Sequence, residues 1–385
     1  MNILIIARGY PSKEDPQWGA FEKDQAFALK GLGHNVNIIS VDRRFVWKRR
    51  KIGITKIEDN GIKVYNLFVI PVLARMIFAN MIKKYLIRYL IKYYLKENVR
   101  PDVIYSHYLL NNSLGNEIKN KYGIPLVAME HWSKLNADVL PDYIRRIGRN
   151  VYKNADAVLA VSNSLLGRIR QHFGVDGYVV NDLLGQEFLS PKVKSIADTD
   201  GRVSFLAMGS LIARKGFDLL IEAFYKAELP KESWKLTIVG GGTLKKKLEE
   251  QIQVKELGSN IILVGQKDKL EILDYLQNAD VFILSSLKET FSVVCIEAMS
   301  QGVPVIATSC GGPEEFVEEK DGLLIKPNDV EALKEAIIKM VSTYRLYDRN
   351  LISDDCLKRF SPNVIATKLT NIFTCLLYTS PSPRD

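Results

Sequence analysis

Two glutamates stand eight residues apart in the stretch ADVFILSSLKETFSVVCIEAMSQGVPVIATSCGGPEE. Glu289 precedes a predicted helix, and Glu297 lies about one and a half turns inside it. A helix amino terminus offers unpaired N–H groups and the positive end of a dipole, so this loop suits an anion. Carboxylates accept hydrogen bonds from hydroxyl groups. The pattern therefore predicts a ligand that carries negative charge and also the hydroxyls of a sugar or ribose.

A strand, a helix and a second strand must position these glutamates. Apolar runs predict strands at Val281–Ser286 and Val303–Thr308, with a helix over Ser292–Gln301 between them. Runs of this length suit strands that are buried on both faces, as in parallel sheets. Such a unit opens its loops at the carboxyl ends of the strands, where Gly311 and Gly312 also lie.

The spacing Glu-x7-Glu, followed by EAMSQGVPVIAT and GGPEE, resembles the signature of the retaining GT-B glycosyltransferases of family 4, the group 1 glycosyl transferases. The resemblance implies an α/β fold of two doubly wound, parallel-sheet, Rossmann-like domains that face each other across a cleft. It also implies metal-independent transfer of a sugar from a nucleotide diphosphate sugar to a glycan or lipid-linked glycan, with no cofactor. The alternative is that both glutamates are solvated charges at helix ends.

Two cations follow another predicted strand, Val203–Met208, in the stretch GSLIARKGFDLLIEAF. Arg214 and Lys215 stand before a helix, where positive charge opposes the helix dipole, so a purely structural role is unattractive. A departing diphosphate needs such counter-charges when no metal supplies them. The resemblance gives the pair this role, although the family often separates its two cations by several residues.

The resemblance assigns further residues. It implies that the donor contacts Gly19, Gly209, Arg214, Lys215, Gly240, Gln266, Glu289, Thr290, Phe291, Ser292 and Glu297. Gly19 matches a glycine that lets the backbone approach the diphosphate, Gln266 lies in a turn that lines the base, and Glu297 is assigned to ribose hydroxyls. The family usually has Pro-Ser at Ser285–Ser286 and often Gly at Ser292.

Two histidines end adjacent predicted strands, in DVIYSH and PLVAMEH. The family carries an active-site histidine near the donor sugar at the position of His131, so His131 joins Glu289, Arg214 and Lys215 as a catalytic candidate. His107 is the competing candidate, and the alternative for either residue is a structural role.

The alternation of elements predicts parallel sheets with helices on both faces. In the first half, strands are predicted at Asn2–Ala7, Asn35–Asp42, Gly61–Val69, Asp102–His107, Leu126–His131, Ala157–Ser162 and Tyr178–Asn181, and helices at Ala20–Leu32, Val72–Lys96, Ser113–Lys121, Tyr143–Lys153 and Asn163–Phe173. The second half adds strands at Val203–Met208, Lys235–Val239, Ile261–Val264, Val281–Ser286, Val303–Ala307 and Leu323–Ile325, and closing helices at Val330–Tyr344 and Asn363–Phe373.

This alternation and the resemblance together divide the chain. The expected parts are an acceptor-side domain (1–182), a linker (183–201), a nucleotide-sugar-binding domain (202–355), a helix that returns to the first domain (356–374) and a tail (375–385). The tail, CLLYTSPSPRD, does not complete the preceding helix and resembles a translated sequencing adapter, so we expect it to be non-native; a natural disordered tail is the alternative.

Charge is uneven along the chain. Residues 41–100 carry 15 Lys and Arg against 4 Asp and Glu. Their net charge is 15 − 4 = +11, which exceeds the net charge of +9 for all 385 residues. Cations and tyrosines interleave in this segment around Arg75, Lys83, Lys84, Arg88 and Lys92. This composition suits a helix at an anionic membrane surface, and equally a helix packed on the first domain with its charges in water. Nucleic acid is not an expected partner.

Four cysteines without metal-ligand spacing indicate a reducing compartment, and the expected location is the cytoplasm, peripheral on the inner face of the membrane. The DTD at Asp198–Asp200 lies in a polar linker, which argues against a metal site, and ARGYPSKEDP lacks the glycines of a nicotinamide-binding turn. The remaining alternatives are a nucleotide-sugar epimerase or phosphorylase on the same fold, and a non-catalytic sugar-nucleotide binder acting as a membrane scaffold.

Overall fold

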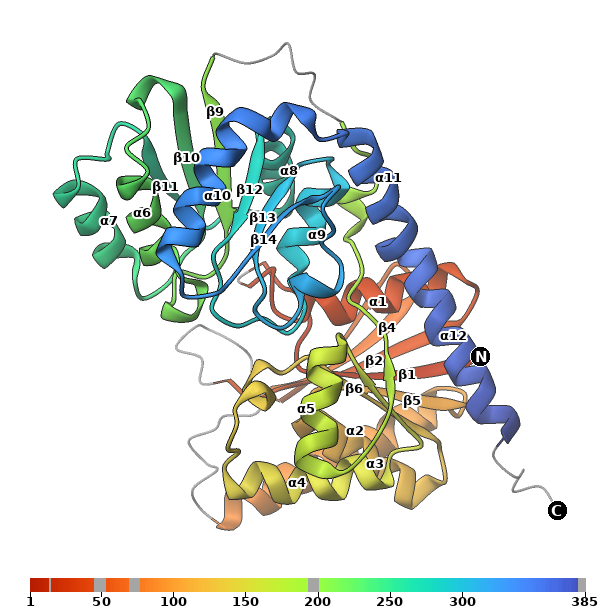
Figure 1. The fold of residues 1–385 in the computed structure, drawn as a ribbon. Helices are drawn as coiled ribbons and strands as arrows, with labels where there is room; N and C mark the ends of the chain where they lie inside the picture. The colour runs from red at the N-terminus through yellow and green to blue at the C-terminus, as the bar shows by residue number, and fades with distance from the viewer. Residues whose placement is uncertain (14, 45–52, 69–76, 193–200, 380–385) are drawn as a thin grey trace. The chain divides into compact units, whose positions relative to one another are not determined.

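The computed structural model describes residues 1–13, 15–44, 53–68, 77–192 and 201–379, and Figure 1 traces their elements. The chain forms two compact units. The first comprises Met1–Val161, Leu165–Asn181 and Pro362–Asp385, and the second comprises Ser162–Ser164 and Asp182–Ser361. Each unit is described separately below.

The sheet of the first unit has the strand order β3-β4-β2-β1-β5-β6-β7-β8 among the described residues. Its strands are β1 (Asn2–Ala7), β2 (Asn35–Asp42), β3 (Gly53–Asp59), β4 (Ile62–Phe68), β5 (Val103–His107), β6 (Leu126–Glu130), β7 (Ala157–Ala160) and β8 (Tyr178–Val179). Neighbours pair in parallel, except that β3 is antiparallel to β4. The parallel strands are buried almost throughout, as their continuous apolar runs predict.

The hairpin of β3 and β4 corrects one prediction, because β3 was not expected and the predicted strand at 61–69 is its partner. Asp59 pairs with Ile62, which leaves Asn60 and Gly61 as a two-residue loop. Both loop residues have positive φ, 47° and 76°, as a type I′ turn requires. The alternation of β3 is weak because it is a half-exposed edge strand with charged side chains.

Helices of the first unit cover the sheet. They are α1 (Ala20–Gly31), α2 (Ile77–Glu97), α3 (Leu109–Tyr122), α4 (Asp142–Asn154), α5 (Asn163–Phe173) and α12 (Pro362–Thr379). Buried residues of α2 and α3 pack on Leu4, Ile6 and Ile39 of the sheet. The predicted start of α2 at residues 72–76 lies outside the described residues.

In the second unit the strand order is β11-β10-β9-β12-β13-β14, and all neighbours in the described sheet are parallel. The elements are β9 (Val203–Met208), α6 (Phe217–Lys226), β10 (Trp234–Val239), α7 (Lys245–Val254), β11 (Ile261–Gly265), α8 (Lys269–Asn278), β12 (Val281–Leu284), α9 (Val293–Ser300), β13 (Val305–Thr308), β14 (Gly322–Ile325), α10 (Val330–Thr343) and α11 (Arg349–Phe360). Helices α6, α7 and α10 share one core with alternate residues of β9, and Figure 1 shows α8 and α9 on the other side of the sheet. The prediction of two doubly wound parallel sheets is confirmed.

Two predicted segments near the chain's joints are wrong, and one helix there was not predicted. The described part of the predicted linker 183–201 is ordered on the second unit, because a 3₁₀ turn at Gln186–Phe188 buries Phe188 completely. Helix α11 was missed because its buried face includes Ser353 and Cys356, so its buried and exposed faces differ little in hydrophobicity. The predicted single helix at 356–374 is therefore the end of α11 and the start of α12, separated at Ser361–Pro362.

The sequence change at Cys375 does not end α12, which continues to Thr379 because Cys-Leu-Leu-Tyr-Thr is compatible with a helix and the first proline comes only at 381. Helix α12 packs on α1, and Thr370 Oγ1 lies 2.9 Å from Nε2 of His34. Within the described residues no helix combines the length and apolar character needed to cross a membrane.

In each described sheet the chain first adds strands on one side of its first strand and then continues on the other side. The boundary between the two sides is the switch point of the sheet. In the first unit this point lies between β1 and β5, and in the second unit between β9 and β12. Ligands of open parallel sheets bind outside the carboxyl ends of the strands at such points. The loops after these four strands are therefore the first places to look for a site.

Candidate active site

In the second unit, a buried carboxylate lies among cations at the switch point. Glu289, in the loop after β12, is 6% exposed. Its Oε1 lies 2.5 Å from Nζ of Lys215 and accepts a hydrogen bond from the Ser286 hydroxyl at 2.6 Å. The Arg214 guanidinium lies 3.7 Å from the other carboxylate oxygen. Three of the four charged residues predicted for the donor site, Arg214, Lys215 and Glu289, are thus brought together as one cluster, and Glu297 lies on the helix that follows.

Backbone contacts between the β9 and β12 loops hold this cluster. Arg214 and Lys215 lie in a 3₁₀ turn that ends at Gly216, whose φ is 63°. A side chain at Gly216 would meet the Ser285 carbonyl oxygen at 2.2 Å, so this close approach requires glycine. The Leu287 amide donates to the Arg214 carbonyl at 2.8 Å. The two loops therefore form one joined structure.

Glycines leave a bare backbone surface beside the cluster. Gly209 and Gly240 follow β9 and β10, and both have φ of 151°. A Cβ on Gly240 would lie 1.8 Å from the Gly209 carbonyl oxygen, so a side chain cannot be accommodated there. Gln266 follows β11, and its Cβ lies 3.8 Å from the place of a Cβ on Gly241. The predicted residues Gly209, Gly240 and Gln266 therefore line neighbouring strand ends.

The loop into α9 contains one buried aromatic ring and one residue with a strained backbone. Phe291 packs against Phe316 and Phe360, with ring centroids 5.0 and 5.6 Å away. Its side chain belongs to the core, so the predicted donor contact can involve only its backbone. Ser292 has φ of 96°, which is unusual for a residue with a side chain, and its buried hydroxyl has no hydrogen-bond partner among the described residues.

Thr290 and Glu297 flank this segment, both partly buried, and Glu297 projects from α9. The Gly311–Gly312 turn after β13 packs on the same loop, since a Cβ on Gly312 would lie 2.4 Å from the Phe291 carbonyl oxygen. The loop between Glu289 and α9 is thus held by backbone contact with the Gly311–Gly312 turn, as the strand–helix–strand unit predicted around Glu289 requires.

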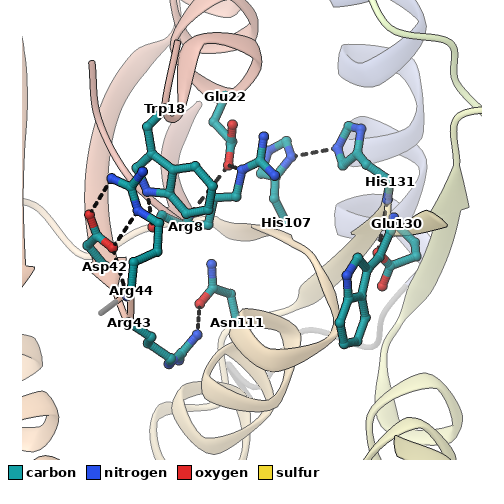
Figure 2. Close-up of polar contacts among 11 residues, drawn as sticks. Arg8, Trp18, Glu22, Asp42, Arg43, Arg44, His107, Asn111, Glu130 and His131 are labelled. Atoms are coloured by element: carbon teal, nitrogen blue, oxygen red, sulfur yellow. Dashed lines mark hydrogen bonds and ion pairs between the residues drawn. The ribbon is translucent and has the colours of Figure 1, made fainter. Parts of the chain in front are cut away.

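In the first unit the structure brings the two candidate histidines together. Nδ1 of His107 lies 3.0 Å from Nε2 of His131, and the rings stack at 5.2 Å (Figure 2). One ring must donate and the other accept, so the pair cannot be doubly protonated in this geometry. Burial, together with the charges of His131 and Arg8, holds the pKa of His107 well below its ordinary value.

Glu130 supports the His131 loop, a role that sequence reasoning missed. Its Oε1 accepts hydrogen bonds from the backbone amides of His131 and Trp132 at 2.9 and 2.8 Å, and the Tyr152 hydroxyl donates to Oε2 at 2.7 Å. Burial raises the pKa of Glu130 above its ordinary value. A buried acid at the end of β6 was the available signal, and it points to an anchored loop.

Gly19 has a structural reason to be glycine. Its φ is 84°, and an added Cβ would lie 2.2 Å from the carbonyl oxygen of Gly9 in the same loop. The sequence predicted a close approach of the backbone at Gly19, and in the structure the group that lies close to it is the backbone of Gly9 in the same loop. Contact of Gly19 with a diphosphate stays a prediction.

Arginines missed by the sequence reasoning surround the end of β1. Arg8 follows β1, and Arg43 and Arg44 follow β2. Figure 2 shows their guanidinium groups near Trp18 and Asn111. The signal was present, because each of these arginines stands directly after a buried strand, as Arg214 and Lys215 stand shortly after β9.

Comparison with known proteins gives consistent matches over most of the chain. The model of the glycosyl transferases group 1 matches residues 192–351, and that of glycosyltransferase family 4 matches residues 23–180. The glycosyltransferase TuaC of Bacillus subtilis, named for teichuronic acid biosynthesis, is 29% identical over 88% of this chain and 89% of its own. An uncharacterized glycosyltransferase of Methanocaldococcus jannaschii, MJ1178, is 30% identical over 64% of this chain and 67% of its own.

Solved structures agree on the fold. A sucrose-phosphate synthase from Thermosynechococcus elongatus superposes with a TM-score of 0.79 at 20% identity, over 99% of this chain and all of the other. HepE of Anabaena, in a complex with UDP and glucose, gives a TM-score of 0.73 at 19% identity, over 97% of this chain and all of the other. The predicted fold class and the predicted family are confirmed. The chain belongs to glycosyltransferase family 4, among the group 1 glycosyl transferases, and is a glycosyltransferase with the GT-B fold.

Proposed function

We propose that this enzyme transfers a sugar from a nucleotide diphosphate sugar, with retention and without a metal ion, to a glycan or lipid-linked glycan in cell-envelope polysaccharide synthesis. The observation that carries the proposal is the cluster of Arg214, Lys215 and Glu289 at the switch point of the second sheet. Retention rests on the family signature. The envelope role is supported by relatives named for teichuronic acid and colanic acid biosynthesis.

In this proposal the Lys215 ammonium and the Arg214 guanidinium stabilise the charge that develops on the departing diphosphate. Fixed cations act in the transition state without having to reorganise, and Glu289 fixes Lys215 at 2.5 Å. The Gly209 backbone lies beside Lys215, since a Cβ on Gly209 would lie 3.4 Å from the Lys215 Cε. We assign Glu297 to the ribose hydroxyls and Gln266 to the base, as the resemblance implies.

We assign His131 to the reacting sugar. Its support is positional, since His131 stands at the family's histidine position, and physical, since its ring and backbone are held in place. The ring contacts His107 and the backbone amide is bound by Glu130. A group fixed in this way can make one directed hydrogen bond to a substrate hydroxyl at little further entropic cost.

We also propose peripheral attachment to the inner face of an anionic membrane. On α2, Ile87, Leu90 and Ile91 are buried in the core of the first unit, so these apolar residues have a structural role. The opposite face exposes Tyr85, Arg88, Tyr89 and Lys92, where tyrosines and cations alternate at helical spacing. Arg75 lies outside the described residues.

Helix α4 adds a cationic face that the sequence reasoning missed. Its exposed side carries Arg145, Arg146, Arg149 and Lys153, whereas Ile144, Val151 and Tyr152 are buried. Each cation that reaches an anionic surface contributes about 1 kcal/mol, so a few suffice for reversible attachment. The cytoplasmic location is supported by Cys295, Cys310 and Cys356, which are buried thiols of the kind found in reducing compartments.

The test is a panel of nucleotide diphosphate sugars incubated with and without glycan acceptors, in excess EDTA. We expect nucleoside diphosphate to appear only when an acceptor is present and to be formed at the same rate in EDTA, and the product to keep the anomeric configuration of the donor by NMR. An inverted product would contradict retention. Loss of turnover in EDTA that Mn²⁺ restores would contradict metal independence and direct attention to Asp198 and Asp200. Release of diphosphate without an acceptor would favour a hydrolytic or epimerase-like reaction.

A further inference from the structure

The first unit contains a pocket at its own switch point. The pocket has a volume of about 210 Å³ and lies at the carboxyl ends of β1, β2, β5 and β6. It is lined by Arg8, Trp18, Val41, Arg43, Arg44, Tyr108, Leu110, Asn111 and Trp132. A water molecule occupies roughly 30 Å³ in the liquid, so the volume corresponds to about seven waters, enough for one sugar-sized group.

The three arginines of the pocket differ in the number of carboxylates that lie close enough to balance their charge. Arg44 pairs with Asp42 at 2.9 Å and with Asp15 at 2.5 Å. Arg8 has Nε 3.5 Å from Glu22. No carboxylate among the described residues lies within ion-pair distance of Arg43, which donates instead to the Asn111 side-chain oxygen at 2.5 Å and to the Leu110 carbonyl at 3.4 Å.

Arg43 therefore carries a positive charge that the described residues leave without a counter-ion. Burial lowers the pKa of Arg43 to about 10, which leaves it cationic at neutral pH. A desolvated charge is costly unless it is paired. The Asn111 side-chain amide nitrogen is also buried and has no hydrogen-bond partner among the described residues. The unpartnered amide of Asn111 thus lies beside a partly exposed guanidinium that has no counter-ion among the described residues.

Aromatic rings give the pocket its other character. The Arg44 and Arg8 guanidinium carbons lie 3.7 and 4.5 Å from the centroid of Trp18, which holds both groups in place. Tyr108 and Trp132 add further ring surface to the lining. Binding sites combine such apolar surface with a few placed polar groups, and here the surface suits the C–H face of a sugar ring.

We propose that this pocket binds an oxyanion carried by the sugar acceptor, so that the enzyme selects acidic glycans; the inference rests on the proposed function above. Arg43 and the Asn111 amide donate to the anionic oxygens, and the guanidinium matches a carboxylate or phosphate in fork geometry. The oxyanion is either the carboxylate of a uronic acid or a phosphate ester on the sugar. The neighbouring aromatic rings contact the sugar that carries it.

Binding of small probes tests the pocket directly, by saturation-transfer NMR at millimolar ligand. The probes are methyl glucoside, methyl glucuronide, the amide of methyl glucuronide, and methyl glucoside 6-phosphate. We expect the two charged probes to bind at least about tenfold more tightly than the two neutral ones, and their affinity to fall with salt. Tighter binding of the glucuronide than of the phosphate identifies a carboxylate acceptor, and the reverse identifies a phosphorylated one.

Two variants locate the effect. Arg43→Gln removes the charge and keeps an amide, and Asn111→Asp places a carboxylate against the Arg43 guanidinium. Both should abolish the preference for charged probes, while the control Arg170→Gln on α5, an exposed arginine that pairs with Asp176 outside the pocket, should retain it. Equal binding of charged and neutral probes by the wild type would overturn the proposal, and so would an unchanged preference in Arg43→Gln and Asn111→Asp proteins that remain folded by thermal melting. Binding of UDP-sugars, followed separately by calorimetry, distinguishes failure of this inference from failure of the proposed function.

Discussion

Substitution of Lys215 by methionine should reduce both stability and turnover, because this side chain balances a buried charge and, in the proposed function, contacts the donor. Met keeps most of the volume and removes the ammonium. It leaves Glu289 with the Ser286 hydroxyl at 2.6 Å and with Arg214 at 3.7 Å. Removal of one partner of a buried ion pair costs about 3–5 kcal/mol. Two remaining donors reduce this, and we expect about 2–3 kcal/mol, or a fall in Tm of about 4–12 °C for a unit of this size.

The effect on the reaction is separate from the effect on stability. Loss of a fixed counter-charge at the departing diphosphate should cost about 3 kcal/mol in the transition state, roughly a hundredfold in kcat/KM. Turnover is measured by nucleoside diphosphate release well below the melting temperature. The control is Lys226→Met, which removes a lysine whose pair with Glu331 is exposed, and which should leave Tm and rate nearly unchanged.

A double variant gives the decisive comparison. Lys215→Met with Glu289→Gln removes the unbalanced carboxylate as well, so it should melt higher than Lys215→Met alone while its turnover stays at least as low. If Lys215→Met melts and turns over like the wild type, the cluster neither balances charge nor contacts the donor. If the double variant melts below Lys215→Met, the loss of stability does not come from an unpaired Glu289.

Three further predictions concern other parts of the molecule. Ser292→Gly should relieve about 1–2 kcal/mol of backbone strain against about 0.5–1 kcal/mol of added chain entropy, so Tm should rise by a few degrees; a lower Tm would contradict the strain. The pKa of His107 is held well below its ordinary value in the folded protein, whereas the unfolded chain takes up the proton near pH 6.5, so stability should fall as the pH drops below 6.5, with a slope that approaches about 1.4 kcal/mol per pH unit. Urea melts of His107→Gln should show a correspondingly flatter pH dependence, and an unchanged slope would assign the proton elsewhere. Arg145→Glu with Arg149→Glu should weaken sedimentation with anionic liposomes at low salt, whereas sedimentation equal to the wild type would exclude α4 from membrane contact.

The sequence predicted the parallel sheets well because their strands are continuous apolar runs with few alternatives. It predicted the donor cluster for a related reason, since Arg214 and Glu289 stand shortly after such runs and parallel strands gather their carboxyl ends at one edge. The hairpin at Asn60–Gly61 was missed although Asn-Gly is a strong turn signal, because the charged residues of β3 hide its alternation.

The arginine-lined pocket of the first unit, which we propose binds the acceptor, was missed for a different reason. Arg43 lies in the basic segment 41–100, which was interpreted as a whole, either as a membrane-binding surface or as a helix with its charges in water. What distinguishes it is tertiary: Asp15 and Asp42 both turn toward Arg44, which leaves Arg43 with an amide partner. No short stretch of sequence predicts these pairings, because they depend on which side chains meet between loops that are far apart in the chain.

The joining of the β9 and β12 loops also has a consequence for hydrogen exchange. The amide hydrogen of Leu287 is held by the Arg214 carbonyl, so it cannot exchange until these two loops separate, whereas the amide of Glu289 is held by the Cys310 carbonyl in the loop after β13. Separation of the β9 and β12 loops also pulls Lys215 away from Glu289, which ties the Leu287 amide to the opening of the charged cluster. Exchange at Leu287 therefore reports how often this cluster opens, and under the proposed function a bound nucleotide sugar would slow it.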